Sequence, residues 1–207
     1  MISTAPVSNN YLELQVSPVW ELNADSFFDF CQLNSHLRIE RNALGKLILF
    51  PLADSLTGNR NAKLIQQLAN WTDKDGTGIG FDSSAGFILP NGATRSPDAS
   101  WIKLTRWNSL SDAQKTKFAP IAPDFIVELR SEAMPIGLSP SDSLQVLKDK
   151  LQEYIDNGVS SGWLIDRPSR QVYIYTPGKN LQCLDNPSTV GNDSLLPGFN
   201  LDLTKIW

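Results

Sequence analysis

The sequence predicts an α/β fold in which a mixed β-sheet is flanked by helices, and three consecutive stretches carry this prediction. Residues 123–129 contain the apolar run FIV, as in a central strand that is buried on both faces. Residues 141–157 repeat apolar side chains at helical spacing, and residues 161–166 form the next strand. Because a helix separates these two strands, we expect them to lie parallel in one sheet.

The same patterns place the other elements. We expect helices over residues 24–33, started by Asn23 or Asp25, over residues 57–72 and over residues 110–118. We expect strands over residues 36–40, 46–52, 79–81, 86–89, 93–102 and 171–175, and a short strand or helical turn within residues 195–207. Residues 1–24 contain Pro6, Pro18 and scattered polar residues, so we expect an irregular N-terminal arm, followed by one domain over residues 25–207.

Composition restricts the chemistry. A net charge of −4 and a pI near 5.0 argue against a protein that coats nucleic acid non-specifically. They do not exclude a nuclease, because carboxylates that hold a cation make an active site locally acidic. The single histidine, His36, excludes zinc sites built on two or three histidines, and a histidine-based triad would have to rest on it. Cys31 and Cys183 lie far apart in the sequence, so we expect each to be unpaired.

The N-terminal stretch MISTAPVSNNYLELQV lacks a basic region followed by an apolar run, so we expect no signal peptide. No apolar stretch approaches the roughly 20 residues that span a bilayer. We therefore expect a cytoplasmic protein that does not insert into membranes.

Two carboxylates are candidates for a metal site. Asp98 follows a proline and stands at the start of the apolar stretch ASWI. Glu128 interrupts the buried strand, where a charge is costly unless it is paired or coordinated. On adjacent strands of one sheet these acids can share a hard cation, because Mg²⁺ needs only one or two protein carboxylates besides water and phosphate oxygens.

Two basic residues accompany these acids. Arg130 follows Glu128 by two positions, so both side chains point to the same face of a strand. Lys150 flanks the apolar stripe of the helix over residues 141–157 and can reach toward Glu128. A Lewis acid, two ligands and an ammonium can activate water against a phosphodiester. Judged singly, Asp98 is typical of a turn residue and Lys150 of a solvated helix flank. Basic residues near the site, such as Arg95, could contact phosphates but are more often solvated surface charges.

Four stretches carry a family resemblance. GFDSSAGFILPNGATRSPDASWI, PDFIVELRS, KDKLQEYIDNGVSSGWLID and LLPGFNLDL together resemble, in order, the Uma-two family of restriction endonucleases, a branch of the PD-(D/E)XK nuclease superfamily. The resemblance extends from about residue 38 to residue 207. It implies a restriction-endonuclease-like α/β core and Mg²⁺-dependent hydrolysis of DNA. Asp98 matches the acid of the PD motif and Glu128 matches the second acid, which implies that these two residues hold the metal.

The sequence departs from the family pattern near this site. The superfamily commonly has a lysine two residues after the second acid, whereas this chain has Arg130 there, and the resemblance places the lysine at Lys150. A guanidinium stays protonated and cannot act as a base, although it can clamp phosphate. Residues 132–140 resemble an insertion that can reshape or cover the site. Glu40 resembles an early family acid and is a candidate further ligand, although a Glu at a strand edge is more often solvated.

Three functional hypotheses follow. The first is an endonuclease dependent on Mg²⁺ or Mn²⁺, with the metal held by Asp98 and Glu128. In it Lys150 orients or helps activate the water, and Arg130 stabilises phosphate charge. The second is a non-catalytic binding or regulatory module on the nuclease fold, favoured by the acidic pI and by the arginine at the usual lysine position. The third is a hydrolase of another substrate. DNA is the expected partner, and cutting of both strands would suit a homodimer with one site per subunit.

Overall fold

The computed structural model describes residues 12–16, 20, 22–50, 53–130 and 140–207. A six-stranded mixed sheet with the strand order β11-β10-β9-β8-β7-β4 forms its centre. The strands are β4 (Gly78–Asp82), β7 (Ala99–Lys103), β8 (Phe125–Arg130), β9 (Ser161–Asp166), β10 (Gln171–Tyr175) and β11 (Gln182–Asp185). Strands β8 and β9 are parallel and are joined through α5 (Pro140–Asp156), as predicted, whereas the other pairs are antiparallel.

A second sheet, which we call the N-terminal sheet because its first three strands precede α2, has the strand order β1-β3-β2-β6-β5. Its strands are β1 (Leu12–Leu14), β2 (Arg38–Arg41), β3 (Leu47–Phe50), β5 (Phe87–Ile88) and β6 (Thr94–Arg95). The arm expected over residues 1–24 is therefore not irregular throughout, because β1 pairs with β3 along its whole length. A two-stranded sheet of β12 (Thr189–Asn192) and β13 (Leu196–Asp202) precedes the terminal turn η1 (Leu203–Lys205).

The helices are α1 (Ala24–Leu33), α2 (Ser55–Asp75), α3 (Leu104–Trp107), α4 (Asp112–Lys115) and α5. The bounds of α1 agree with the prediction, and the side chain of Asn23 caps its first turn. Helix α2 is longer than predicted, from the cap Asp54 to Gly76, whose φ of 68° suits a glycine that ends a helix. The helix expected over residues 110–118 is shortened to α4.

The strand expected over residues 93–102 is in fact two strands in two different sheets. Residues 96–98 separate β6 from β7, and Pro97 lies in this break because proline has no N–H to donate to a ladder. The chain therefore crosses from the N-terminal sheet to the central sheet immediately before β7. This crossing carries Asp98 to the junction of the two sheets.

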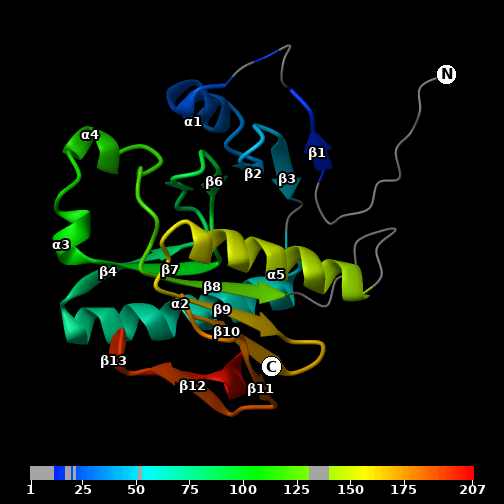
Figure 1. Ribbon diagram of the computed structural model, residues 1–207, viewed down its shortest axis with the longest axis vertical. Coiled ribbons are helices and arrows are strands. Elements are labelled where there is room, and N and C mark those ends of the chain that lie inside the picture. The colour runs from blue at the N-terminus through cyan, green and yellow to red at the C-terminus, as the bar shows by residue number, and fades with distance from the viewer. Residues whose placement is uncertain (1–11, 17–19, 21, 51–52, 131–139) are drawn as a thin grey trace.

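The two faces of the central sheet are covered by different elements, as Figure 1 shows. On one face Leu151 and Tyr154 of α5 pack with Ile126 of β8. On the other face α2 and β13 enclose a larger core in which Trp163 stacks on Phe199, with ring centroids 6.0 Å apart. Because side chains alternate along a strand, Glu128 and Arg130 share the α5 face with Ile126.

Two smaller expectations concern cysteines and membranes. Cys31 and Cys183 are both unpaired, as predicted. Within the described ranges no helix is long and apolar enough to cross a membrane.

Candidate active site

Lys150 is the centre of a buried ionic cluster that joins three elements. Its ammonium Nζ lies 2.8 Å from Oε1 of Glu128 on β8 and 2.9 Å from Oε1 of Glu40 on β2. Only 10% of the Lys150 side chain is exposed, and Glu40 and Glu128 are more deeply buried. Figure 1 shows why these residues meet, since α5 lies between the N-terminal strands and the central sheet. The structure thus brings together the predicted lysine, the predicted second acid and Glu40, which the sequence offered as a candidate further ligand.

Asp98 lies beside this cluster at the start of β7. Its Oδ2 accepts a hydrogen bond of 2.8 Å from the backbone N–H of Leu129, and its Oδ1 lies 3.4 Å from Nη1 of Arg38. The first ladder pair of β7 and β8 joins Ala99 to Val127, so Asp98 lies next to the part of β8 that carries Glu128. The two carboxylates also interact electrostatically, because the charge of Asp98 adds to the effect of burial in raising the pKa of Glu128.

Arg130 shares a face of β8 with Glu128 but pairs with a different acid. Its Nη1 lies 2.7 Å from Oδ1 of Asp166 at the end of β9, and its Nε donates to Oγ of Ser143 at 3.4 Å. The Arg130 side chain is 7% exposed and that of Asp166 is fully buried. The structure therefore places Arg130 next to the acid–lysine cluster, held by Asp166. Its predicted contact with phosphate stays a prediction.

Three further residues complete the cluster. Arg95 on β6 lies 3.1 Å from Oε2 of Glu40 and 2.7 Å from Oε2 of Glu153. The hydroxyl of Tyr154 donates to Oε1 of Glu128 at 3.2 Å. Arg38 contacts Asp98. Sequence reasoning treated Arg95 as a surface charge and gave the other two no role in the site, although Tyr154 stands one helical turn after Lys150.

The pKa values of the two buried glutamates shift in opposite directions. Burial, helped by the charges of Asp98 and Glu40, outweighs the nearby Lys150 and raises the pKa of Glu128 to about 7. Burial would also raise the pKa of Glu40, but Lys150 and Arg95, with Arg38, outweigh it and lower the pKa. Near neutral pH, therefore, Glu40 is ionised while Glu128 is divided between its two protonation states.

Lys150 keeps its proton in this setting. Burial would lower the pKa of its ammonium, but the carboxylates of Glu128 and Glu40 outweigh burial and raise it. The side chain is therefore a fixed positive charge rather than a neutral amine. It can stabilise negative charge or orient a water, but it is poorly suited to remove a proton.

The predicted metal ligands fit a hard divalent cation. Asp98 and Glu128 offer carboxylate oxygens, and burial raises the pKa of Glu128 despite the nearby Lys150, so a bound cation would favour its ionised form. Within the described ranges no group of three or more His, Cys, Asp and Glu residues is arranged to hold a metal. Glu40 does not extend the pair, because its Oε1 accepts from Lys150 and from the N–H of Ser96, and its Oε2 faces Arg95.

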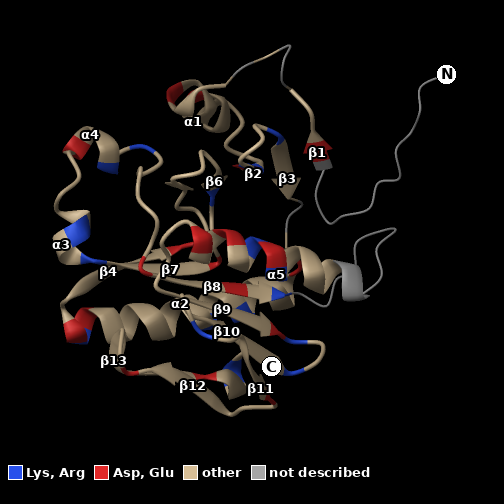
Figure 2. Cartoon of the chain, viewed as in Figure 1, with Lys and Arg blue, Asp and Glu red and all other residues tan. Residues whose placement is uncertain are grey.

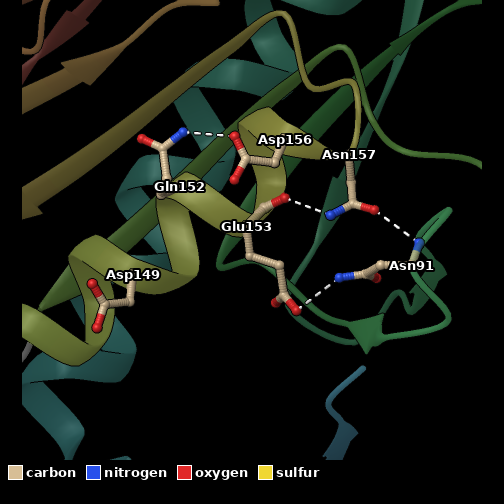
Figure 3. A pocket seen from close by; sticks show the side chains of 6 residues that line it. All are labelled: Asn91, Asp149, Gln152, Glu153, Asp156 and Asn157. Atoms are coloured by element: carbon tan, nitrogen blue, oxygen red, sulfur yellow. Dashed lines mark hydrogen bonds between the residues drawn. The ribbon is translucent and has the colours of Figure 1, made fainter. Parts of the chain in front are cut away.

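An acidic hollow adjoins the cluster on the outer face of α5. It is lined by Asn91, Asp149, Gln152, Glu153, Asp156 and Asn157. Figure 3 shows Asn91 from the β5–β6 turn donating to Glu153 of α5, a bond of 3.0 Å. Its carboxylates would repel phosphate, so this face is a poor surface for a nucleic acid.

Comparison with known proteins places the chain in a family. A family model described as "Putative restriction endonuclease" matches residues 24–204. The chain belongs to the Uma2 family. It is also similar to a crystal structure from Anabaena variabilis ATCC 29413, described as "a putative nuclease belonging to DUF820". The two chains are 18% identical with a TM-score of 0.68, and the match covers 90% of this chain and 97% of that one. A search of curated proteins found no match.

Membership of the Uma2 family confirms the resemblance noted in the sequence, and the structural match confirms the restriction-endonuclease-like fold. The insertion expected over residues 132–140 falls outside the described residues, apart from Pro140 at the start of α5. The positions expected of the Uma2 site are Asp98, Glu128 and Lys150. They converge at the junction of the two sheets.

Proposed function

We propose that this Uma2 protein is an endonuclease that uses Mg²⁺ or Mn²⁺ to hydrolyse phosphodiester bonds of DNA. The observation that carries the proposal is the convergence of Asp98, Glu128 and Lys150 from three separate elements, with Lys150 2.8 Å from Glu128. A buried arrangement of two acids and an ammonium is costly to a fold and is the kind of feature that function explains. Family membership supports the nuclease assignment.

In the proposed enzyme Asp98 and Glu128 would hold the metal. A bound divalent cation would supply a Lewis acid and lower the pKa of a water molecule. Lys150 would place a fixed positive charge beside Glu128, where it can orient the attacking water and stabilise charge that develops on the phosphate. Tyr154 would hold Glu128 through its hydroxyl.

Glu40 would act as a positioning residue rather than as a ligand. Its two oxygens hold Lys150 and Arg95, so it fixes the ammonium against Glu128. Arg130 lies on the same face of β8, and we propose that it adds positive charge near the phosphate while it remains paired with Asp166. A guanidinium suits this role because it does not lose its proton.

A test of this function is cleavage of supercoiled and linear DNA with Mg²⁺ or Mn²⁺, with chelator as the blank. Asp98→Asn and Glu128→Gln should abolish cleavage and weaken Mn²⁺ binding measured by calorimetry. Asp149→Asn is the matched control, because this carboxylate precedes Lys150 on α5 but is exposed and accepts only from Gln145 among the described residues. Undiminished cleavage by Asp98→Asn would contradict the proposal that Asp98 holds the catalytic metal.

A non-catalytic module is the second candidate, and one observation favours it. The cluster is largely neutralised by its own side chains, because Lys150 faces Glu128 and Arg38 faces Asp98. A site balanced in this way needs no metal to keep its fold. On this alternative no DNA would be cleaved with either metal, and any DNA binding would survive Asp98→Asn.

Partner and location are part of the same proposal. Duplex DNA would be the substrate, and two subunits would be needed to cut both strands with one site each. We propose that the protein acts in the cytoplasm. Sedimentation of the protein with and without a short duplex tests the dimer, and a monomer bound to DNA would contradict it.

A further inference from the structure

We propose that Arg38 is the residue that binds the phosphodiester group at this site, a role that the sequence suggested for Arg130. The proposal rests on the nuclease function above. It depends on three properties of the Arg38 side chain, namely its exposure, its spare hydrogen-bonding capacity and its position over Phe50.

Arg38 is the most exposed cation around the described cluster. Its side chain is 34% exposed, compared with 10% for Lys150, 10% for Arg95 and 7% for Arg130. A phosphate that approaches from solvent therefore meets Arg38 first. Figure 2 shows basic and acidic residues interspersed over the chain, so attraction of DNA to the site depends on such individual contacts.

The hydrogen bonds of Arg38 leave part of its guanidinium unused. Nη2 donates to the carbonyl of Ser96 at 2.8 Å, but the contact from Nη1 to Asp98 is long, at 3.4 Å. Nε is buried and has no hydrogen-bond partner among the residues that the structure describes. Buried donors are normally paired, so Nε is a part of the guanidinium whose hydrogen-bonding capacity the described residues do not use. In Arg95, by contrast, Nε, Nη1 and Nη2 all face carboxylates within 3.1 Å.

Arg38 and Lys150 both lie close to the ring of Phe50. The guanidinium carbon of Arg38 lies 5.2 Å from the centre of the Phe50 ring, and Nζ of Lys150 lies 5.7 Å from it. The carbonyl of Ser96 holds one edge of the guanidinium, while Nη1 remains beside Asp98. A phosphate oxygen bound near Asp98 would thus meet a planar donor group suited to paired contacts with phosphate.

A structural role is the competing explanation, in which Arg38 only holds Asp98 in place. The two explanations differ in their consequences for metal binding. If Arg38 only orients Asp98, its loss should weaken Mn²⁺ binding and leave metal-free DNA binding unchanged. If Arg38 binds phosphate, its replacement should weaken DNA binding. The same replacement removes a positive charge that competes with the metal, so Mn²⁺ affinity should stay equal or rise.

The experiment compares Arg38→Gln with Arg41→Gln, using anisotropy of a labelled 20-base-pair duplex in Ca²⁺ and in chelator, and calorimetry with Mn²⁺. Arg41 is a matched control because it lies on the same strand, stacks on Phe27 at 5.1 Å and donates to backbone carbonyls. We expect Arg38→Gln to weaken DNA binding about tenfold or more and to reduce the salt slope by about one, while Arg41→Gln changes neither. Arg38→Lys should lose less affinity than Arg38→Gln because it keeps the charge.

Unchanged DNA affinity and salt slope in Arg38→Gln would overturn the proposal, and so would weaker Mn²⁺ binding with intact metal-free DNA binding. Thermal unfolding of each variant shows whether a loss of DNA binding reflects misfolding. If Arg38→Gln does not fold, the DNA affinity of Arg38→Lys is compared with that of the wild type instead. If the wild type cleaves DNA and Arg38→Gln binds it equally well, only this inference fails. If the wild type neither binds nor cleaves DNA, the proposed function fails as well.

Discussion

Glu40 and Lys150 stand 110 positions apart in the sequence, yet the ammonium of Lys150 lies 2.9 Å from a carboxylate oxygen of Glu40. This contact connects the N-terminal sheet with the helix that covers the central sheet. Because Lys150 also contacts Glu128, the distant Glu40 helps to determine where the site's ammonium lies. The N-terminal sheet is therefore a part of the candidate site and not an appendage to it.

Replacement of Glu40 by Gln should destabilise the protein and lower cleavage. It leaves Lys150 and Arg95 with one carboxylate fewer in a buried setting, which typically costs about 3–5 kcal/mol. Urea unfolding measures this loss. Glu13→Gln is the control, because Glu13 pairs with Lys46 at 3.4 Å on the surface, where such pairs contribute about 0–1 kcal/mol. Equal stability of the two variants would contradict a role for Glu40 in holding the cluster.

Asp166 and Arg130 allow a second comparison between a buried and an exposed ion pair. Both this pair and the pair of Lys117 with Asp25 have a shortest separation of 2.7 Å, but only the first is buried. Asp166→Asn should therefore cost about 3–5 kcal/mol, whereas Asp25→Asn should cost less than about 1 kcal/mol. Denaturant midpoints check both values.

The Asp166 substitution also separates stability from metal binding. Asp166 contacts Arg130 rather than the proposed ligands, so Asp166→Asn should retain Mn²⁺ affinity at temperatures where it is folded. A loss of Mn²⁺ binding as large as that of Asp98→Asn would show that Asp166 belongs to the metal site itself.

Much of this arrangement could be predicted from local patterns. Strands β9 and β10 and helix α1 have the predicted bounds, because their apolar runs or caps are local features. Glu128 could be identified because an acid inside a buried apolar strand needs a partner. Asp98 and Lys150 required the family resemblance, since neither residue is unusual in its local sequence.

What could not be predicted depends on contacts between distant segments. Arg38 joins the site only because β2 packs beside α5, and no local pattern encodes that docking, while Glu40 was a candidate only through the family resemblance. Strand β11 was not predicted because most of its residues are exposed, and β12 was not predicted because its four residues include only one apolar side chain, that of Val190. The pairing of Arg130 with Asp166 follows from the parallel register of β8 and β9, in which these two residues are opposite each other.

Without metal, stability should depend on the ionisation of Glu128. Its pKa is about 7 when folded, against an ordinary value of 4.5, so the folded state binds this proton more tightly than the unfolded state. The protonated Glu128 therefore contributes its full stabilisation to the folded state below about pH 4.5, and this contribution is lost as the pH rises through about 7. Glu40 acts in the opposite sense, because its lowered pKa adds stability that is lost on acidification.

Glu128→Gln should remove the first of these dependences. The amide cannot ionise, so chelator-treated Glu128→Gln should show a flatter stability profile between pH 4.5 and 7 than the wild type. Urea unfolding of the wild type and of Glu128→Gln across this range measures the effect. Identical slopes in wild type and Glu128→Gln would mean that Glu128 has an ordinary pKa.

Metal binding should release a proton from Glu128 at pH values below about 7. The carboxylate must be ionised to coordinate a cation, and the raised pKa keeps a proton on it in the metal-free protein. Mn²⁺ affinity should rise by up to about tenfold per pH unit below pH 7 and level off above it. Calorimetry in two buffers of different ionisation enthalpy should find nearly one proton released at pH 6 and almost none at pH 8.5. Release that is independent of pH would show that the metal does not displace this proton, and Asp98→Asn should show weakened binding at either pH.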